Sequence, residues 1–191
     1  MTIIDRYMQN KEPDSKVEIK YFSSKMSNGD PTINAYILIN GEMYRVRSEL
    51  LVFNKERNKI YAIKLNEINQ YGIKAILPGG SAEPEKTLKE QAIIETKEEC
   101  EILVKNVFYS GVRIVKKYAK YPKWQKELLW PLGYKYEGHC TFVFIGEFDK
   151  KIGRMVCGTE WDHESAKRFK FYNPEELGLD KERIDIINKY R

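Results

Sequence analysis

The sequence has few of the residues that hold transition metals or build disulfide frameworks. It contains three cysteines, two histidines and three tryptophans among 191 residues. Cys100, Cys140 and Cys157 show no zinc-site spacing, and their odd number indicates free thiols in a reducing compartment. No apolar run approaches the ~20 residues that span a bilayer, and residues 1–6 show no basic-then-apolar leader. We therefore expect a cytoplasmic protein with no membrane partner.

The composition is that of an ordinary globular chain. Hydrophobic residues make up 42% and charged residues 32% of it, which is typical of a folded domain with its own core. We therefore expect a single domain over residues 1–191. The formal net charge of +5 fits an anionic partner, although a modest excess is also common in proteins that have none.

Alternating apolar residues and turn signals predict mainly strands. We expect strands at residues 17–22, 33–39, 43–46, 49–53, 59–64, 72–77, 102–109 and 166–172. The apolar run over 141–148 predicts a central, buried strand. Helices are expected from Pro84 to about residue 100, over 173–177, and over 180–191. The first helix has an apolar stripe that consists of Leu88, Ala92, Ile93, Thr96 and Cys100.

An acidic cluster on that first helix carries the strongest functional signal. Glu95, Glu98 and Glu99 are spaced i, i+3 and i+4, so they share one helical face and repel one another. Carboxylate oxygens in a compact cluster suit Mg²⁺ or Mn²⁺, whereas the alternative is a solvated acidic face. Gly79 and Gly80 precede the helix, and glycines allow the close backbone approach that a phosphate or metal site needs.

This arrangement resembles the Nudix hydrolase family, whose motif is G, five residues, E, seven residues, then R-E-U-x-E-E-x-G-U. With the motif glycine set on Gly80, the matching positions are Glu95, Glu98, Glu99 and Ile102. Four positions depart from the motif: Lys86, Ile94, Thr96 and Glu101. Ile94 replaces the arginine that orients the first helix glutamate in the family. Glu83 and Glu85 are candidates to replace the early glutamate, whose position Lys86 occupies.

The resemblance implies an α+β fold, namely a Nudix-type α/β/α sandwich with a mixed β-sheet and an added N-terminal β-meander. Residues 1–46 would form the extension and residues 47–191 the Nudix core, with an insertion at about 113–138. The meander has three interpretations, which are packing against the core, contact in a homodimer and formation of one wall of the substrate pocket.

Residues 113–126 hold six basic residues and no acidic one, interleaved with aromatic rings. Cations and aromatic faces together suit a nucleotide or an RNA 5′ end, whereas the alternative is a solvated lid. The candidates for substrate binding are Gly79, Gly80, Arg113, Lys117, Tyr118 and Tyr121. Tyr118 lies sixteen residues beyond Ile102, which resembles the subgroup that hydrolyses dinucleoside polyphosphates.

The resemblance also implies the chemistry. Glu95, Glu98 and Glu99 would hold Mg²⁺ or Mn²⁺, and Glu95 or Glu164 would activate the attacking water. We predict a pyrophosphohydrolase that cleaves a phosphoanhydride bond in a nucleoside diphosphate linked to another moiety: a nucleotide, a dinucleoside polyphosphate, a nucleotide sugar or ADP-ribose. The alternatives are a catalytically weak or inactive nucleotide-binding module, and an RNA 5′-end pyrophosphohydrolase or nucleic-acid binder.

Overall fold

Two long strands that run side by side in parallel form the centre of the molecule. The computed structural model describes residues 20–25, 31–39, 42–67, 74–84, 86–116, 133, 135–153 and 166–191. Strand β3 (Glu42–Phe53) pairs in parallel with β7 (Lys135–Lys151) over almost its whole length. The middle of β7 is buried from Cys140 to residue 146, which confirms the prediction of a central strand there.

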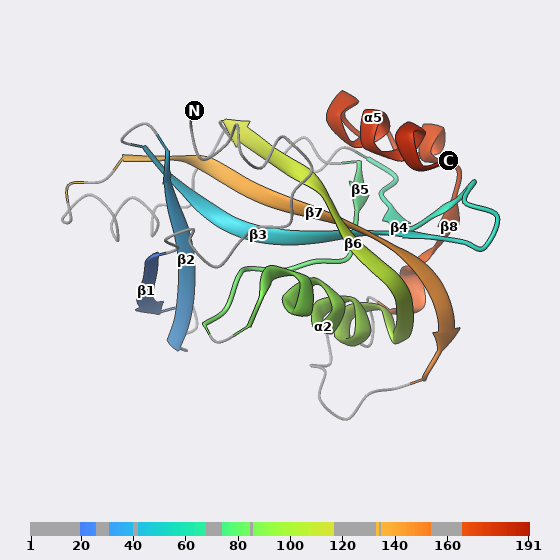
Figure 1. Cartoon of the computed structure of the whole chain (residues 1–191), viewed down its shortest axis with the longest axis horizontal. Helices are drawn as coiled ribbons and strands as arrows, with labels where there is room; N and C mark the ends of the chain where they lie inside the picture. The colour runs from blue at the N-terminus through green and yellow to red at the C-terminus, as the bar shows by residue number, and fades with distance from the viewer. Residues whose placement is uncertain are drawn as a thin grey trace.

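The other strands join this pair in antiparallel fashion (Figure 1). Strand β6 (Ile102–Lys116) pairs with β7, and β2 (Pro31–Ile39) pairs with β3 and with β1 (Lys20–Lys25). Strand β4 (Ile60–Lys64) contacts β3, β5 (Ala75–Ile76) and β8 (Lys170–Tyr172). The sheet is therefore mixed and mostly antiparallel, and the class is α+β as predicted. The Nudix-specific sandwich remains a prediction.

Each face of the sheet is covered by one helix. Strand side chains alternate between the two faces. Val46 and Leu50 of β3 pack in one cluster with Ala92 of α2 (Leu88–Cys100), and Leu51 packs in the other with Ile187 of α5 (Lys181–Tyr190). Figure 1 shows α2 and α5 on opposite sides of the long strands.

The start and end of α2 are both set by local chemistry. Thr87 caps the helix, because its hydroxyl accepts the Glu90 N–H while the Glu90 carboxylate accepts the Thr87 N–H. The helix therefore begins at Leu88, later than the predicted Pro84. Glu101 ends it in the left-handed conformation, with φ 54°. The buried residues of α2 are Leu88, Gln91, Ala92, Thr96 and Cys100, so four members of the predicted stripe are confirmed.

Several boundaries differ from those that alternation predicts. Strand β3 is continuous, although two strands were expected at 43–46 and 49–53, because Arg47 and Ser48 keep their pairing with β7. Residues 166–168 are helical rather than extended, and β8 covers only Lys170–Tyr172. Residues 174–176 form a short 3₁₀ helix. None of the described helices is both long and apolar enough to cross a membrane.

Glu101→Gly should stabilise the protein. Glu101 occupies a left-handed position that costs an L-residue about 1–2 kcal/mol, whereas glycine adopts it freely at a smaller entropic cost. We expect the free energy of unfolding to rise by about 0.5–1 kcal/mol. The matched control is Lys97→Gly, which places glycine inside the same helix and should lower stability by about 1 kcal/mol. Urea denaturation checks both, and equal losses in the two variants would contradict the assigned role of Glu101.

Candidate functional site

The turn that contains Gly79 is held tightly between β3 and α2. Backbone hydrogen bonds run from the Ser48 N–H to the Gly80 carbonyl and from the Leu50 N–H to the Pro78 carbonyl, both at 2.9 Å. The Gly79 N–H donates to Oε2 of Glu99 at 3.1 Å. Gly79 has φ +148°, and a Cβ there would lie 2.2 Å from the Ser48 carbonyl oxygen. Only glycine therefore fits at this position.

Gly80 makes room for the first acidic residue of α2. A Cβ at Gly80 would lie 2.3 Å from the carboxyl carbon of Glu95, so this carboxylate rests directly against the turn. Gln91 Nε2 donates to Oε1 of Glu95 at 2.6 Å. The structure thus brings four of the predicted site residues together: Gly79, Gly80, Glu95 and Glu99.

The electrostatic environment of Glu95 is acidic. Burial raises the pKa of Glu95, and the charges of Glu98 and Glu83 raise it further. The hydrogen bond from Gln91 and the charge of Arg47 act in the opposite direction but do not outweigh them. An added cation would relieve this excess of negative charge.

The acidic residues do not form a closed metal-binding group. Within the described ranges, no three acidic, histidine or cysteine side chains are arranged as a metal site. Lys86, which replaces the early motif glutamate, donates to Oε2 of Glu83 at 2.7 Å. The hard carboxylate oxygens of Glu95, Glu98 and Glu99 fit Mg²⁺ in their chemistry and charge, although they do not converge on one point.

A pocket of about 450 Å³ lies beside Gly79, on the face of the sheet that α5 covers. Its walls are residues 74–79, the start of α5, and strands β3, β6 and β7. The charged side chains that line it are Arg47, Glu49, Lys74, Arg113, Asp180 and Arg183. Four are cationic and two anionic, so the pocket favours an anionic ligand.

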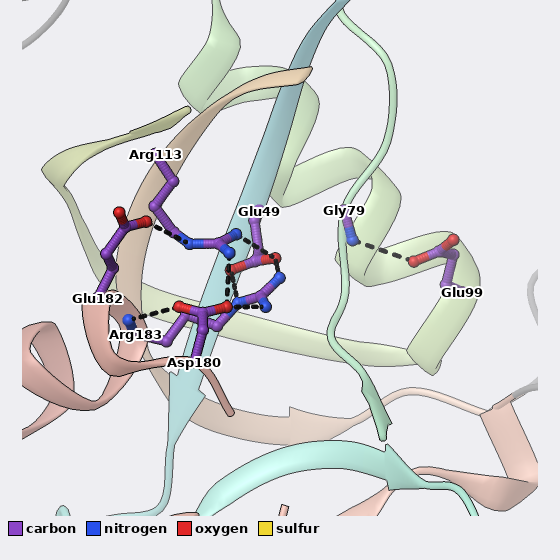
Figure 2. A network of polar contacts seen from close by, with 7 residues as sticks. All are labelled: Glu49, Gly79, Glu99, Arg113, Asp180, Glu182 and Arg183. Carbon is purple, nitrogen blue, oxygen red and sulfur yellow. Dashed lines mark hydrogen bonds and ion pairs between the residues drawn. The ribbon is translucent and has the colours of Figure 1, made fainter. Parts of the chain in front are cut away.

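Part of this charge is neutralised in a partly buried network at the start of α5. Arg183 forms a bidentate ion pair with Glu49 and contacts Asp180 at 2.7 Å. Arg113 contacts Asp180 at 2.5 Å and Glu182 at 3.5 Å, and it is only 6% exposed. Figure 2 shows this network on one side of the segment that carries Gly79, with Glu99 on the other side.

The network fixes the protonation of its members. Burial alone would raise the pKa of Glu49, but Arg183 and Arg113 outweigh it and hold that pKa below its ordinary value. Burial is likewise outweighed at Asp180, whose pKa is lowered by Arg183 and Arg113. These residues stay charged and paired with one another, and they line one part of the pocket.

His139 also lines the pocket. Burial lowers its pKa to about 3, and the charges of Arg47 and Arg45 act in the same direction. The ring is therefore uncharged at neutral pH and offers a neutral polar contact.

The predicted basic segment is only partly described. Strand β6 continues through Lys116, so Arg113 lies on a strand and pairs with acidic residues, rather than on the loop expected from 113 onward. Four other predicted site residues lie outside the described part of the chain: Lys117, Tyr118, Tyr121 and Glu164.

Sequence reasoning missed most residues of the pocket. Arg47, Lys74 and the pair Asp180 and Arg183 come from three distant parts of the chain, and none of them belongs to a motif. One signal was present, because Arg45, Arg47 and Glu49 alternate along an otherwise apolar strand. Charges at period two on a central strand indicate a polar site on one face.

Comparisons with known proteins give a fold likeness only. No family model matches the sequence, and no curated protein sequence matches it. Among solved structures, the chain is similar to a NUDIX hydrolase from Nitrosomonas europaea, with a TM-score of 0.48 and 14% sequence identity. The match covers 77% of this chain and 88% of that one. A likeness of this extent does not assign a function.

Gly79→Ala and Gly80→Ala should behave differently. At Gly79 the added methyl group meets fixed backbone of β3 at a strained φ, so we expect a stability loss of at least about 2 kcal/mol. At Gly80 it meets only the end of the flexible Glu95 side chain, so the fold should persist with Glu95 displaced. Thermal unfolding of both variants checks this, and similar stability losses would contradict it.

The stability of the protein should decrease in acid through the Glu49 network. Glu49 and Asp180 have folded-state pKa values below their ordinary 4.5 and 3.8. Such carboxylates stabilise the fold above their unfolded pKa, and this contribution is lost as the pH falls through the folded pKa. We expect the free energy of unfolding to fall below about pH 4.5.

Urea denaturation over a series from neutral to acidic pH measures this slope. Glu49→Gln should be less stable at neutral pH, because Arg183 loses one of its two carboxylate partners and keeps only Asp180, and it should show a shallower decrease in acid. An unchanged slope in this variant would show that other groups cause the acid sensitivity.

Proposed function

We propose that this protein is a divalent-metal-dependent pyrophosphohydrolase of Nudix type. It would cleave a phosphoanhydride bond in a nucleoside diphosphate linked to another moiety. The observation that carries the proposal is the direct contact between the glycine turn and the acidic helix, through the Gly79–Glu99 hydrogen bond and the packing of Glu95 on Gly80. The match of the same residues to the Nudix motif supports it.

The residues that would hold Mg²⁺ or Mn²⁺ are Glu95, Glu98 and Glu99. Their oxygens are hard donors, and Glu95 lies in an environment with excess negative charge. When bound, the metal ion supplies positive charge that stabilises the developing negative charge of the leaving phosphate.

The rest of the chemistry falls to the chain itself. Gly79 and Gly80 let the turn pack closely on β3 and on Glu95, and the cationic pocket that Gly79 lines would attract and orient the anionic substrate. Glu95 and Glu164 are the two candidates for accepting the proton of the attacking water. The reaction is then a displacement at phosphorus that depends mainly on positioning and charge stabilisation.

A binding module without turnover is the second candidate function. It is favoured by the lack of a closed three-carboxylate group among the described residues, beside a pocket of net positive charge. Such a protein would bind nucleotides and hydrolyse none of them. A nucleic-acid binder, in contrast, would lose affinity steeply with rising salt.

Glu98→Ala should abolish metal-dependent hydrolysis and leave the fold intact. Glu98 is half-buried on α2 and is not among its buried core residues. Loss of a metal ligand should lower turnover by at least about 100-fold, because changes in outer-shell partners alone cost about 10–100-fold. The measurement is a panel of phosphoanhydrides with and without Mg²⁺, in which product masses show which bond breaks.

The control is Glu56→Ala, which removes an exposed carboxylate in the turn between β3 and β4. It should keep full turnover. Full activity in Glu98→Ala would refute the assignment of the acidic helix. No hydrolysis of any substrate by the wild-type protein, together with nucleotide binding, would favour the binding module.

A further inference from the structure

Two cations of the pocket are not neutralised by the network at α5. Arg113 and Arg183 are both paired with carboxylates. Arg47 and Lys74 line the same pocket, and neither makes an ion pair with a residue in the described part of the chain. No carboxylate of the described residues therefore neutralises these two cations, and both can face a ligand in the pocket.

The register of the sheet fixes the place of Arg47. Arg47 is opposite Thr141 on β7, and Thr141 is opposite Arg113 on β6. These three residues form one row across three adjacent strands, and all three line the pocket. Arg47 is half-buried and lies on a central strand. A rigid strand positions a ligand-binding side chain more precisely than a loop does.

Lys74 lines the pocket from a different segment. It is exposed and directly precedes β5, and its side chain passes close to Gly178, before α5. An anion in the pocket would thus meet one half-buried cation from β3 and one exposed cation, which we call the rim contact.

The end of α5 cannot provide this recognition by itself. Asp180 caps the helix by accepting the Arg183 N–H at 3.0 Å, and its second oxygen contacts Arg113. The helix terminus therefore already has its own carboxylate, and the available positive charge is that of Arg47 and Lys74.

We infer that this pocket is a binding site for a diphosphate group, with Arg47 as its central contact and Lys74 as its rim contact. The inference rests on the proposed function, because it names the place where the substrate of that reaction is held. Arginine suits phosphate oxygens because its planar fork donates two parallel hydrogen bonds.

The neighbouring polar residues indicate the rest of the ligand. His139 and Thr141 line the pocket next to Arg47, and neither carries a charge at neutral pH. A volume of about 450 Å³ suits a ligand larger than the diphosphate alone. The ligand class is therefore a diphosphate bonded to an uncharged polar group, such as a sugar or a nucleoside.

The test is calorimetric titration of the full chain with methylenediphosphonate, which resists hydrolysis, in the presence of a chelator. Arg47→Gln should weaken binding about 10- to 100-fold, which corresponds to the loss of one hydrogen bond to a charged group. Lys74→Gln should weaken it less, because that side chain is exposed. The matched control is Arg168→Gln, which removes the same charge from an exposed residue outside the pocket lining and should bind like the wild type.

Wild-type affinity in Arg47→Gln, or an equal loss in Arg168→Gln, would overturn the inference. If Arg47→Gln does not fold, Lys74→Glu is the variant to test. It reverses an exposed charge at the rim and should abolish most of the binding. Unchanged binding in Lys74→Glu would also overturn the inference. These readouts use neither metal nor turnover. A protein that hydrolyses nothing yet needs Arg47 for the diphosphonate would refute the proposed function and leave the pocket assignment standing.

Discussion

The arrangement of the whole site depends on the pairing of residues 78–80 with β3. Two backbone hydrogen bonds fix this segment along the central strand, and Gly79 packs so closely on Ser48 that no side chain fits between them. The segment forms part of the wall between the acidic face of α2 and the pocket on the other face of the sheet. A ligand that spans this wall would touch carboxylates on one side and guanidinium groups on the other.

Separation of opposite charges by a thin backbone segment is chemically useful. If acidic and basic groups met directly, they would neutralise one another, as Glu49 and Arg183 do at the start of α5. Instead, Glu95 stays in an environment with excess negative charge and Arg47 acts on it only at longer range. The two sides of the segment therefore attract ligands of opposite sign: a cation for the helix and an anion for the pocket.

The sequence was sufficient for features that local chemistry determines. The stripe Leu88, Ala92, Thr96 and Cys100 indicates the buried side of α2, whereas the contacts of Glu95 and Glu99 with the glycine turn were not predicted. It was not sufficient for features that depend on tertiary pairing. The pairing of β8 with β4 begins at Lys170, so residues 166–168 have no partner on β4. Arg47, Arg113 and Thr141 form a row only because β3, β6 and β7 adopt one register.

The network at α5 has a consequence for how the chain matures during synthesis. Glu49 and Arg113 lie on central strands, but their partners Asp180 and Arg183 are made after every strand of the sheet. A nascent chain that still lacks these residues has only the 3.9 Å contact between Arg113 and Glu49, so both side chains lack the closer ion pairs that they form with the start of α5. Docking of the last helix therefore completes the core on one face of the sheet and the pocket in one step, whereas the core on the α2 face needs no residue of that helix.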